Sequence, residues 1–266
     1  MSGLAKRCEM CDNSGILIPK VDAMPRFFIA GTNLAGGMAI LRGRDAEHVR
    51  VLRLKPGEDV IICDGQGTDY KCRLVSADRE QAEAEILEVV PCPAEPSVKL
   101  TVLCGLPKGD RTDYIIQKCV EAGAGEIVFF PSARCVARPD TPEKKLERWQ
   151  RIAEEAAKQS GRGIIPPVRW VYDFAGALDI AVKQELGLFL YETGEREALD
   201  RVLEANKTVK TAALITGPEG GFEPFEAKLA AIAGLHVCSM GERILRCETA
   251  PVVATTAVMY ATGNLG

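Results

Sequence analysis

The sequence predicts an α/β protein with two folded parts, a small β-barrel over residues 24–92 and a larger parallel-sheet domain over residues 97–266. Three observations lead to this prediction. Short strand-like runs separated by Gly, Pro and Asp fill the first part, as in small barrels. Three prolines in residues 91–96 mark a linker, because proline favours extended backbone and cannot continue a sheet interior. Beyond the linker, strands alternate with helices, a pattern typical of a parallel sheet covered on both faces.

The expected barrel rests on apolar runs and on alternating polar and apolar residues. The apolar run at residues 60–63 is typical of a buried strand, and a Gly- and Asp-containing turn follows it. One short helix is expected over residues 45–52. The folded part is expected to start at residues 24–29, and strands are expected at residues 60–63, 70–75 and 82–90.

The larger domain shows repeated strand–helix units. Asp110 is expected to cap the first helix, and Thr141-Pro142 to open the second, with cap and first-turn proline in their favoured places. Strands are expected at residues 100–104, 127–130, 186–191, 212–216 and 236–239. Helices are expected at residues 110–122, from 141 onward, and at 196–205, 224–233 and 249–262.

Composition narrows the class of protein. Among 266 residues, 47% are apolar and 26% charged, which is typical of a soluble globular protein. No apolar run reaches the ~18 residues of a membrane span, and the N-terminus lacks the apolar core of a signal peptide. The sequence therefore predicts a cytoplasmic protein that is not bound to a membrane.

The ten cysteines fit the same compartment, since most lie in apolar contexts where a reduced thiol behaves as a small hydrophobe. Residues 1–23 show little periodicity, and we expect them to form a disordered tail. Cys8 and Cys11 in this tail make a lone C-x-x-C without a second pair at zinc spacing. An incidental pair is favoured over metal or redox use, and no metal site is predicted.

The positive charge is clustered although the net charge is −4. This balance argues against indiscriminate nucleic-acid binding but allows a local basic face. One cluster spans residues 42–55. A second, interspersed with acids, begins at Lys108 and Arg111, whose side chains could reach a phosphate. A solvated surface is the alternative interpretation, and contact with phosphates is the functional one.

Two glycine-bearing loops near the C-terminus are the most informative motifs. The segments 215–222 (ITGPEGGF) and 240–250 (MGERILRCETA) each follow an apolar strand and precede a helix. At the carboxyl ends of neighbouring parallel strands, such loops would form one ligand pocket. The first is neither a Walker loop nor a G-x-G-x-x-G motif, and a tight turn remains its alternative interpretation. Its glycines expose bare backbone, to which a ligand can approach closely.

The residues within these loops limit the chemistry. Ile244 and Leu245 offer an apolar wall that can hold an adenine by backbone hydrogen bonds. Arg246 and Glu248 flank this wall at a helix start, where they are candidates for a site, although Arg246 could simply pair with the acid. Because His48 and His236 are the only histidines, histidine-based acid–base chemistry and a Ser/His/Asp triad are poorly supported. Proton transfer and the stabilisation of charge would then fall to carboxylates and arginines.

Several motifs in order give the chain a family resemblance. It resembles the bacterial 16S ribosomal RNA uridine N3-methyltransferases, a branch of the SPOUT superfamily, over about residues 24–262. Met240 and Cys247 depart from this pattern, standing where leucine and threonine are expected. The matching segments are residues 48–67, 106–111 (LPKGDR), 115–118, 132–136 (SARCV), 155–162 (EAAKQSGR), 217–222 and 243–250.

The resemblance implies properties that the residue pattern does not give. It implies a PUA-like barrel that binds RNA, and a SPOUT methyltransferase domain whose parallel sheet contains a deep C-terminal trefoil knot. Knotted chains are very rare among protein folds, so this expectation rests on the resemblance alone. It also implies the cofactor S-adenosyl-L-methionine, 16S ribosomal RNA or the small ribosomal subunit as partner, and a homodimer with the pocket near the subunit interface.

The resemblance also implies residue roles. Arg246 would stabilise negative charge on the uracil oxygens, and Glu219 or Glu248 would remove the N3 proton. The residues expected to bind the cofactor, chiefly through backbone, are Leu190, Thr216, Gly217, Gly220, Gly221, Met240, Gly241, Ile244 and Leu245. The residues expected to bind RNA are Arg26, Arg42, Arg50, Arg53, Lys108, Arg134 and Arg162.

Two other functions remain open from the sequence. One is a non-catalytic RNA-binding or ribosome-assembly factor that keeps the pocket as part of its fold. The other is a nucleotide-dependent oxidoreductase, which the missing dinucleotide fingerprint opposes.

Overall fold

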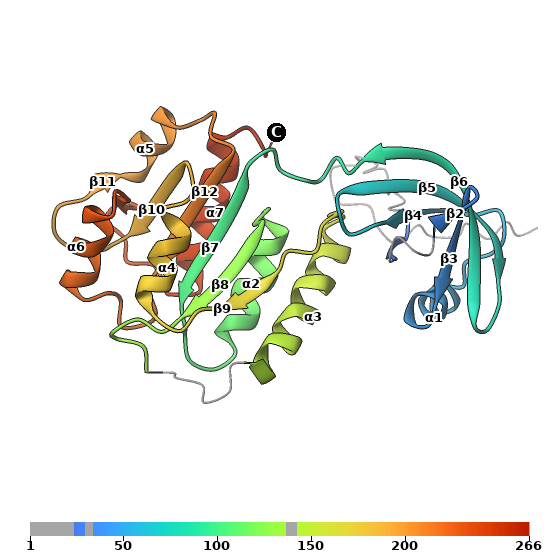
Figure 1. Cartoon of the computed structure of the whole chain (residues 1–266), viewed down its shortest axis with the longest axis horizontal. Helices are drawn as coiled ribbons and strands as arrows, with labels where there is room; N and C mark the ends of the chain where they lie inside the picture. Colours follow the sequence, from blue (N-terminus) through green and yellow to red (C-terminus); the bar gives the residue numbers. More distant parts are fainter. Residues whose placement is uncertain (1–23, 30–33, 137–142, 266) are drawn as a thin grey trace, which may run out of the picture.

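The computed structural model describes residues 24–29, 34–136 and 143–265. The chain forms two domains, each built on one sheet, that lie side by side (Figure 1). The tail with Cys8 and Cys11, and the Thr141-Pro142 helix start, lie outside the described residues. Within them, no helix combines the length and apolar character that crossing a membrane requires.

The N-terminal domain is a curled six-stranded sheet with one helix, in the order β1-β4-β5-β6-β3-β2. The pair β1·β4 is parallel, and the other pairs are antiparallel. Register shifts between Lys71 and Cys72 and between Leu74 and Ser76 break the β5–β6 ladder, and such bulges increase the local twist. The elements are β1 (Arg26–Phe28), β2 (Leu34–Ala35), β3 (Met38–Arg42), α1 (Arg44–Val51), β4 (Asp59–Cys63), β5 (Thr68–Ala77) and β6 (Gln81–Pro91).

The C-terminal domain confirms the predicted parallel sheet. Its seven strands run in the order β11-β13-β10-β12-β7-β8-β9, and all six pairings are parallel. All strands therefore end at the same edge of the sheet. The strands are β7 (Lys99–Gly105), β8 (Glu126–Phe130), β9 (Val168–Trp170), β10 (Leu186–Leu190), β11 (Glu197–Ala198), β12 (Thr211–Thr216) and β13 (His236–Ser239).

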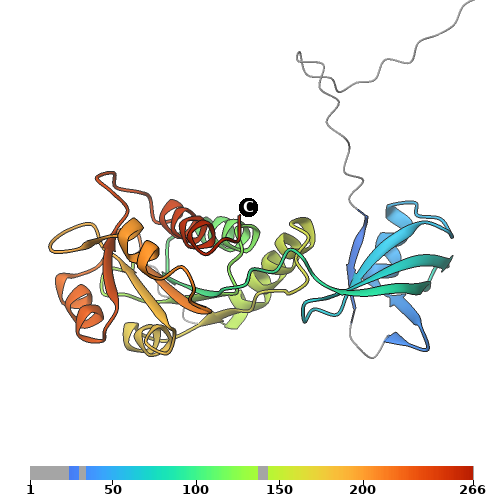
Figure 2. The same ribbon diagram turned by 90° about the horizontal axis from the view of Figure 1, so that it is seen from above.

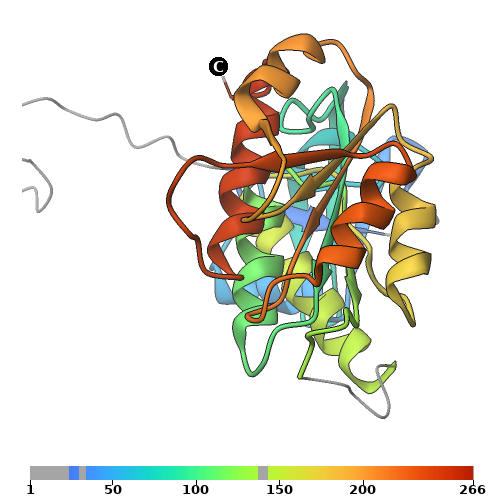
Figure 3. The ribbon, with the colours of Figure 1, turned by 90° about the vertical axis from the view of Figure 1, so that its left-hand side faces the viewer.

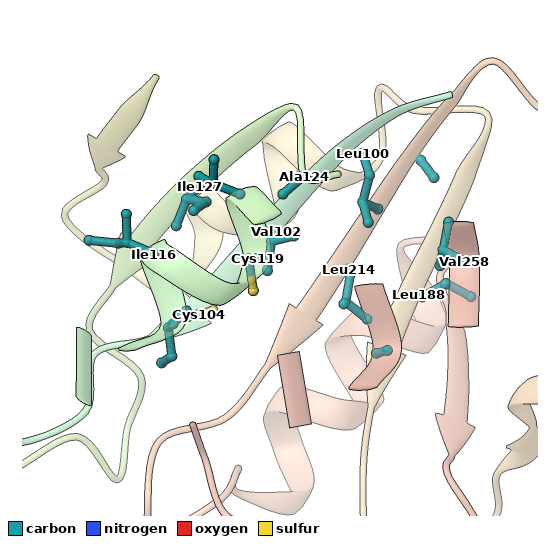
Figure 4. Close-up of a cluster of buried hydrophobic side chains, with 14 of the residues drawn as sticks. Leu100, Val102, Cys104, Ile116, Cys119, Ala124, Ile127, Leu188, Leu214 and Val258 are labelled. Atoms are coloured by element: carbon teal, nitrogen blue, oxygen red, sulfur yellow. The ribbon is translucent and has the colours of Figure 1, made fainter. Parts of the chain in front are cut away.

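Helices cover both faces of this sheet (Figure 3). Helices α2, α3, α5 and α7 pack on one face, and α4 and α6 on the other. Figure 4 shows the core of the first face, where side chains of α2 and α7 meet those of the sheet. The helices are α2 (Arg111–Glu121), α3 (Glu143–Gln159), α4 (Phe174–Ala181), α5 (Leu199–Ala205), α6 (Pro224–Ile232) and α7 (Thr249–Ala261).

Local sequence explains most helix boundaries. Helix α2 buries its apolar face, and Asp110 occupies the N-cap position, but its side chain accepts no capping hydrogen bond. Helix α6 begins after Glu223, whose N–H donates to the carboxylate of Glu226 at 2.8 Å. Helix α4, which the sequence pattern missed, is capped by Asp173, which accepts from the N–H of Gly176 at 2.7 Å.

Two sequence expectations are corrected by the sheet. The helix expected at residues 196–205 starts only at Leu199, because Glu197 and Ala198 pair with β13 as a short edge strand. The strands before the two glycine loops are not neighbours, because β10 lies between β12 and β13. The two loops therefore flank a third strand end.

The core of the larger domain gives a stability prediction. Trp149 of α3 is 1% exposed, and its ring centroid lies 4.8 Å from that of Phe129 in β8. Trp149→Ala should lower the free energy of unfolding by about 3–5 kcal/mol, because it removes a large buried ring and leaves a cavity. Ile232→Ala on α6, at a side chain that is 72% exposed, should change it by less than about 0.5 kcal/mol. Urea unfolding measures both, and equal losses would contradict this packing.

Candidate functional site

One cavity of about 670 Å³ lies where the loops after β10, β12 and β13 meet the start of α7. Its volume is in the range of sites that hold cofactors and other small molecules. The two glycine loops do share one pocket, as expected, but the loop after β10 completes it with Tyr191, Glu192 and Arg196. This third wall has no glycine-rich signature, which is why the sequence pattern did not reveal it.

The turn at residues 217–221 packs tightly against the end of β7. The φ angle of Gly221 is +66°, a conformation that favours glycine, and its N–H donates to the carbonyl of Pro218 at 2.9 Å. A Cβ on Gly105, the last residue of β7, would lie 2.5 Å from Cδ and 2.9 Å from N of Pro218. Gly105 therefore lets the turn rest on the strand end, a role that its sequence context did not indicate.

Arg111 links the two glutamates that the sequence singled out. Its Nη1 donates to Oε1 of Glu219 at 2.7 Å, and its Nε lies 3.4 Å from Oε2 of Glu248. The backbone N–H of Lys108 also donates to Oε1 of Glu219, at 2.8 Å. The Arg111 guanidinium thus offsets the repulsion between two carboxylates on one side of the cavity. The sequence indicated Arg111 only as a possible phosphate contact.

Glu248 is held in its ionised form. Partial burial alone would raise the pKa of Glu248, whereas hydrogen bonds from its own backbone N–H and from the Cys247 thiol lower it. The positive charges of Arg111 and Arg246 act in the same direction, and the resulting pKa is below the usual glutamate value. Glu248 is therefore a carboxylate at neutral pH.

Cys247 supplies a donor where the resemblance expects threonine. Burial, followed by the hydrogen bond to Glu248, raises the pKa of the Cys247 thiol to about 12. The thiol thus stays protonated and donates to Oε2 of Glu248 at 3.2 Å. This departure from the family pattern preserves a hydrogen-bond donor at the same place.

Arg246 stands apart from this network. Its Nη1 lies 4.0 Å from Oε1 of Glu248, at the limit of an ion pair, and its side chain is 85% exposed. The simple pairing considered from the sequence is therefore weak, and the guanidinium at the cavity wall has donors to offer a ligand.

The remaining cofactor candidates gather in the same place. Every position that the resemblance assigns to the cofactor lines the cavity, together with the three catalytic candidates. The lining combines bare glycine backbone and apolar side chains with charged side chains. The cofactor candidates are Leu190, Thr216, Gly217, Gly220, Gly221, Met240, Gly241, Ile244 and Leu245.

The RNA-binding candidates divide into exposed and buried residues. Arg42, Arg50, Arg53 and Lys108 are exposed. Arg134 is exposed but donates to the Glu223 carboxylate at 2.9 and 3.2 Å and to the carbonyl of Gly220 at 3.1 Å, so it also braces the glycine turn.

The structure places the other two RNA-binding candidates inside the protein. Arg26 pairs with Asp69 at 2.7 Å, and its side chain is 11% exposed. Arg162 is 3% exposed and pairs with Glu95 at 2.7 Å. Each guanidinium is engaged with a carboxylate and has little exposed surface to offer a phosphate. Their partners lie 43 and 67 residues away in sequence, too far for a local pattern to indicate.

The described cysteines are free and mostly buried. Burial raises the pKa of the Cys104 and Cys238 thiols to about 12, so both stay protonated inside the sheet. Across the residues that the structure describes, no group of three or more His, Cys, Asp and Glu side chains is arranged to hold a metal ion.

Comparison with known proteins agrees with both domains. Residues 94–259 match the family model of an RNA methyltransferase domain, and residues 41–87 match that of an RNA methyltransferase PUA domain. The chain is 34% identical over 229 residues to ribosomal RNA small subunit methyltransferase E of Bacillus subtilis, covering 84% of this chain and 90% of that protein.

Solved structures show the same relationship. Ribosomal RNA small subunit methyltransferase E from Neisseria gonorrhoeae, bound to S-adenosyl methionine, is 32% identical with a TM-score of 0.77, over 89% of this chain and 97% of that one. A putative methyltransferase from Legionella pneumophila, in complex with the same cofactor, is 28% identical with a TM-score of 0.74, over 90% of this chain and 98% of that one. Because the family model matches more than half of the chain and the similarity to these relatives extends over most of its length, the chain belongs to the ribosomal RNA small subunit methyltransferase E family.

Proposed function

We propose that the protein transfers a methyl group from S-adenosylmethionine to N3 of a uridine in 16S ribosomal RNA. One observation carries the proposal: in a chain of this family, a single cavity joins a wall of bare glycine backbone to a carboxylate pair and an exposed arginine. The uridine N3 position comes from the family resemblance, whereas the methyl donor is also supported by the relatives that hold it.

The residues present fit S-adenosylmethionine. When bound, this cofactor supplies a methyl group made electrophilic by its attachment to a sulfonium. Leu190, Met240 and Leu245 offer apolar surface for the adenine, and the turn at residues 217–221 exposes backbone groups beside them. The carboxylate of Glu192, whose Oε1 lies 2.5 Å from the place that a Cβ on Gly221 would take, adds negative charge that suits a cationic donor.

Glu248 suits the role of base better than Glu219. Uridine N3 is a weak nucleophile until its proton leaves, so an ionised carboxylate must stand nearby. Both donors that the structure gives Glu219 converge on its Oε1, and Arg111 anchors it there. In Glu248 the thiol of Cys247 donates to Oε2, and no described side chain pairs with Oε1 more closely than Arg246, at 4.0 Å. We therefore assign proton removal to Oε1 of Glu248 and the anchoring of Arg111 to Glu219.

Arg246 completes the proposed site. Its exposed guanidinium can donate to the uracil oxygens, on which negative charge accumulates once the proton has left. The target base must be unpaired or turned out of its stack to reach the cavity. The exposed Arg42, Arg50 and Arg53 on the barrel would hold the surrounding RNA backbone, with Lys108 and Arg134 nearer the cavity.

Arg26 and Arg162 have no place in this RNA surface because Arg162 is buried and Arg26 largely buried, each in an ion pair. A non-catalytic assembly factor is less consistent with the site, since such a protein does not need an ionised carboxylate beside an exposed arginine. The oxidoreductase interpretation has no support from the family to which the chain belongs.

The proposal includes a homodimer in the cytoplasm, where its ribosomal substrate is found. Exposed apolar side chains, Ile244 in the cavity wall and Val253 and Tyr260 on α7, offer contact area for a second copy. The trefoil knot stays a prediction of the family resemblance.

The proposed reaction has a direct cellular test. Small-subunit ribosomal RNA from cells that lack this protein should lose one N3-methyluridine, and purified protein with S-adenosylmethionine should restore it. Mass mapping of the RNA measures both steps. An unchanged modification pattern, or restoration that requires a nicotinamide nucleotide, would refute the reaction.

The exposed arginine makes a second prediction. Arg246→Ala should lower kcat for methyl transfer by about 10²–10³-fold, because a donor to the developing oxyanion is lost. Its affinity for S-adenosylmethionine, measured by calorimetry, should stay close to that of the original protein. Arg243→Ala, in the same loop, is the matched control and should retain most activity. Near-full activity in Arg246→Ala would rule out its catalytic role.

The pH profile distinguishes the two glutamates. Glu248→Gln should lower kcat at neutral pH by about 10²–10⁴-fold, and its activity should recover as pH rises, because alkaline solution removes the uridine proton without a base. Glu219→Gln should lose less activity and keep the original pH profile. Rates of methyl transfer measured from about pH 6 to about pH 10 give both results. Alkaline recovery in Glu219→Gln alone would show that the assignment is reversed.

A further inference from the structure

The two domains meet at a compact joint made of three chain segments. These are the turn at residues 64–67 of the barrel, the linker at residues 92–96, and the loop at residues 160–164 after α3. Figure 2 shows the two domains meeting where the linker and this loop lie together. The N–H of Gly67 donates to the carbonyl of Gly163 at 3.3 Å, and Gln66 forms an isolated bridge with Ile164. The barrel thus contacts the larger domain directly, in addition to being tethered by the linker.

Glu95 of the linker is the centre of this joint. Its Oε2 accepts from Nη2 of Arg162 at 2.7 Å, and its Oε1 accepts from Nε of Arg162 at 3.3 Å. The same Oε1 also accepts from the backbone N–H groups of Gly163 and Ile164, at 2.9 and 3.0 Å. One carboxylate therefore fixes both the side chain and the backbone of the loop after α3.

Arg162 is fully engaged on its other side. Its Nη1 donates to the carbonyl of Ala124 and, at 3.3 Å, to that of Val120, at the end of α2. Every nitrogen of the guanidinium has a partner, and the residue is 3% exposed. The pair between Glu95 and Arg162 thus ties the linker to the body of the larger domain.

A second buried pair lies on the barrel side of the joint. Arg26 of β1 donates to both carboxylate oxygens of Asp69, at 2.7 and 2.9 Å. Its Nη1 also lies 3.8 Å from the Cys92 sulfur, and the Cys92 thiol lies 3.5 Å from the carbonyl of Gly161. A line of buried polar contacts therefore runs from the barrel through Cys92 to the loop that Glu95 fixes.

Close packing leaves little room for the barrel to swing. A Cβ on Gly163 would lie 2.6 Å from the Cβ of Cys92. On the outer side, Lys158 of α3 approaches Asp45 of α1 at 3.9 Å, and its Nζ lies 5.9 Å from the ring centroid of Phe28. Buried ion pairs tolerate few alternative arrangements, because a displaced charge would be left buried without a partner.

We propose that Glu95 and Arg162 are positioning residues that hold the barrel in one orientation, so that RNA bound by the barrel meets the cavity at a set distance. The inference rests on the proposed function for its RNA step, but the orientation itself can be measured without RNA. Arg162, expected from the sequence to contact phosphate, acts through the domain joint instead.

The test uses a double variant that is expected to fold. Glu95→Leu with Arg162→Met replaces the pair by apolar side chains, an exchange that often preserves stability while removing directional contacts. Asp59→Leu with Arg73→Met is the matched control, since this pair is exposed and lies within the barrel. Spin labels attached by non-cysteine chemistry at Glu80 of the barrel and Lys207 of the larger domain report the distance between the domains.

The original protein and the control should give one narrow distance distribution, and the Glu95/Arg162 variant should give a broader one. In the same variant, KM for small-subunit ribosomal RNA should rise about tenfold, because a barrel of variable orientation presents its RNA contacts to the cavity at a lower effective concentration. Its kcat and its affinity for S-adenosylmethionine should stay within about twofold. A distribution as narrow as the original, or an unchanged KM, would overturn the proposal. Failure of the original protein to methylate the RNA would count against the proposed function, and the distance distribution would still decide the orientation.

Discussion

The order of the parallel strands is the constraint on which the site depends. Because β10 lies between β12 and β13, three strand ends meet at one edge, and the loops that follow them enclose a single cavity. The tight contact between Gly105 and Pro218 sets the height of the glycine turn above the sheet. Any larger residue at Gly105 would push this turn away from β7, and with it Glu219 and the backbone that lines the cavity.

Charge within the cavity is organised around Arg111. Two carboxylates on one wall would repel each other, and the guanidinium between them compensates by contacting both. The Cys247 thiol adds a neutral donor to Glu248, which keeps this group ionised without placing another fixed charge in the cavity. Arg246 is thereby left with its donors exposed, as the stabilisation of a substrate oxygen requires. The proposed division of labour between Glu248 and Glu219 follows from this asymmetry.

Local sequence patterns predicted much of this structure. The long strands of the larger domain and the buried face of α2 follow from apolar runs and helical periodicity, which neighbouring residues determine. The expected cofactor positions follow from the family resemblance, and all of them line one cavity. Helix α4 was missed because it is only eight residues long and carries Gly176 in its first turn.

Other features depend on tertiary contacts that a local pattern does not contain. The place of β10 between β12 and β13 is a property of the whole sheet. Arg26 and Arg162 are ordinary cations in the sequence, and only the fold brings Asp69 and Glu95 to them. The bridging role of Arg111 likewise requires segments 108 and 137 residues further along the chain, at Glu219 and Glu248, to reach the start of α2.

A titration of isotope-labelled protein with S-adenosylmethionine, followed through backbone amide resonances, examines the cavity most directly. Saturable shifts should concentrate at the ends of β10, β12 and β13, in the turn at residues 217–221 and in residues 240–245, because their backbone forms the wall that would hold the donor. Donor concentrations up to about 1 mM suffice, because enzymes rarely bind their substrates more weakly than this. Shifts confined to other parts of the chain, or shifts that do not saturate at this concentration, would contradict a donor site at this edge of the sheet.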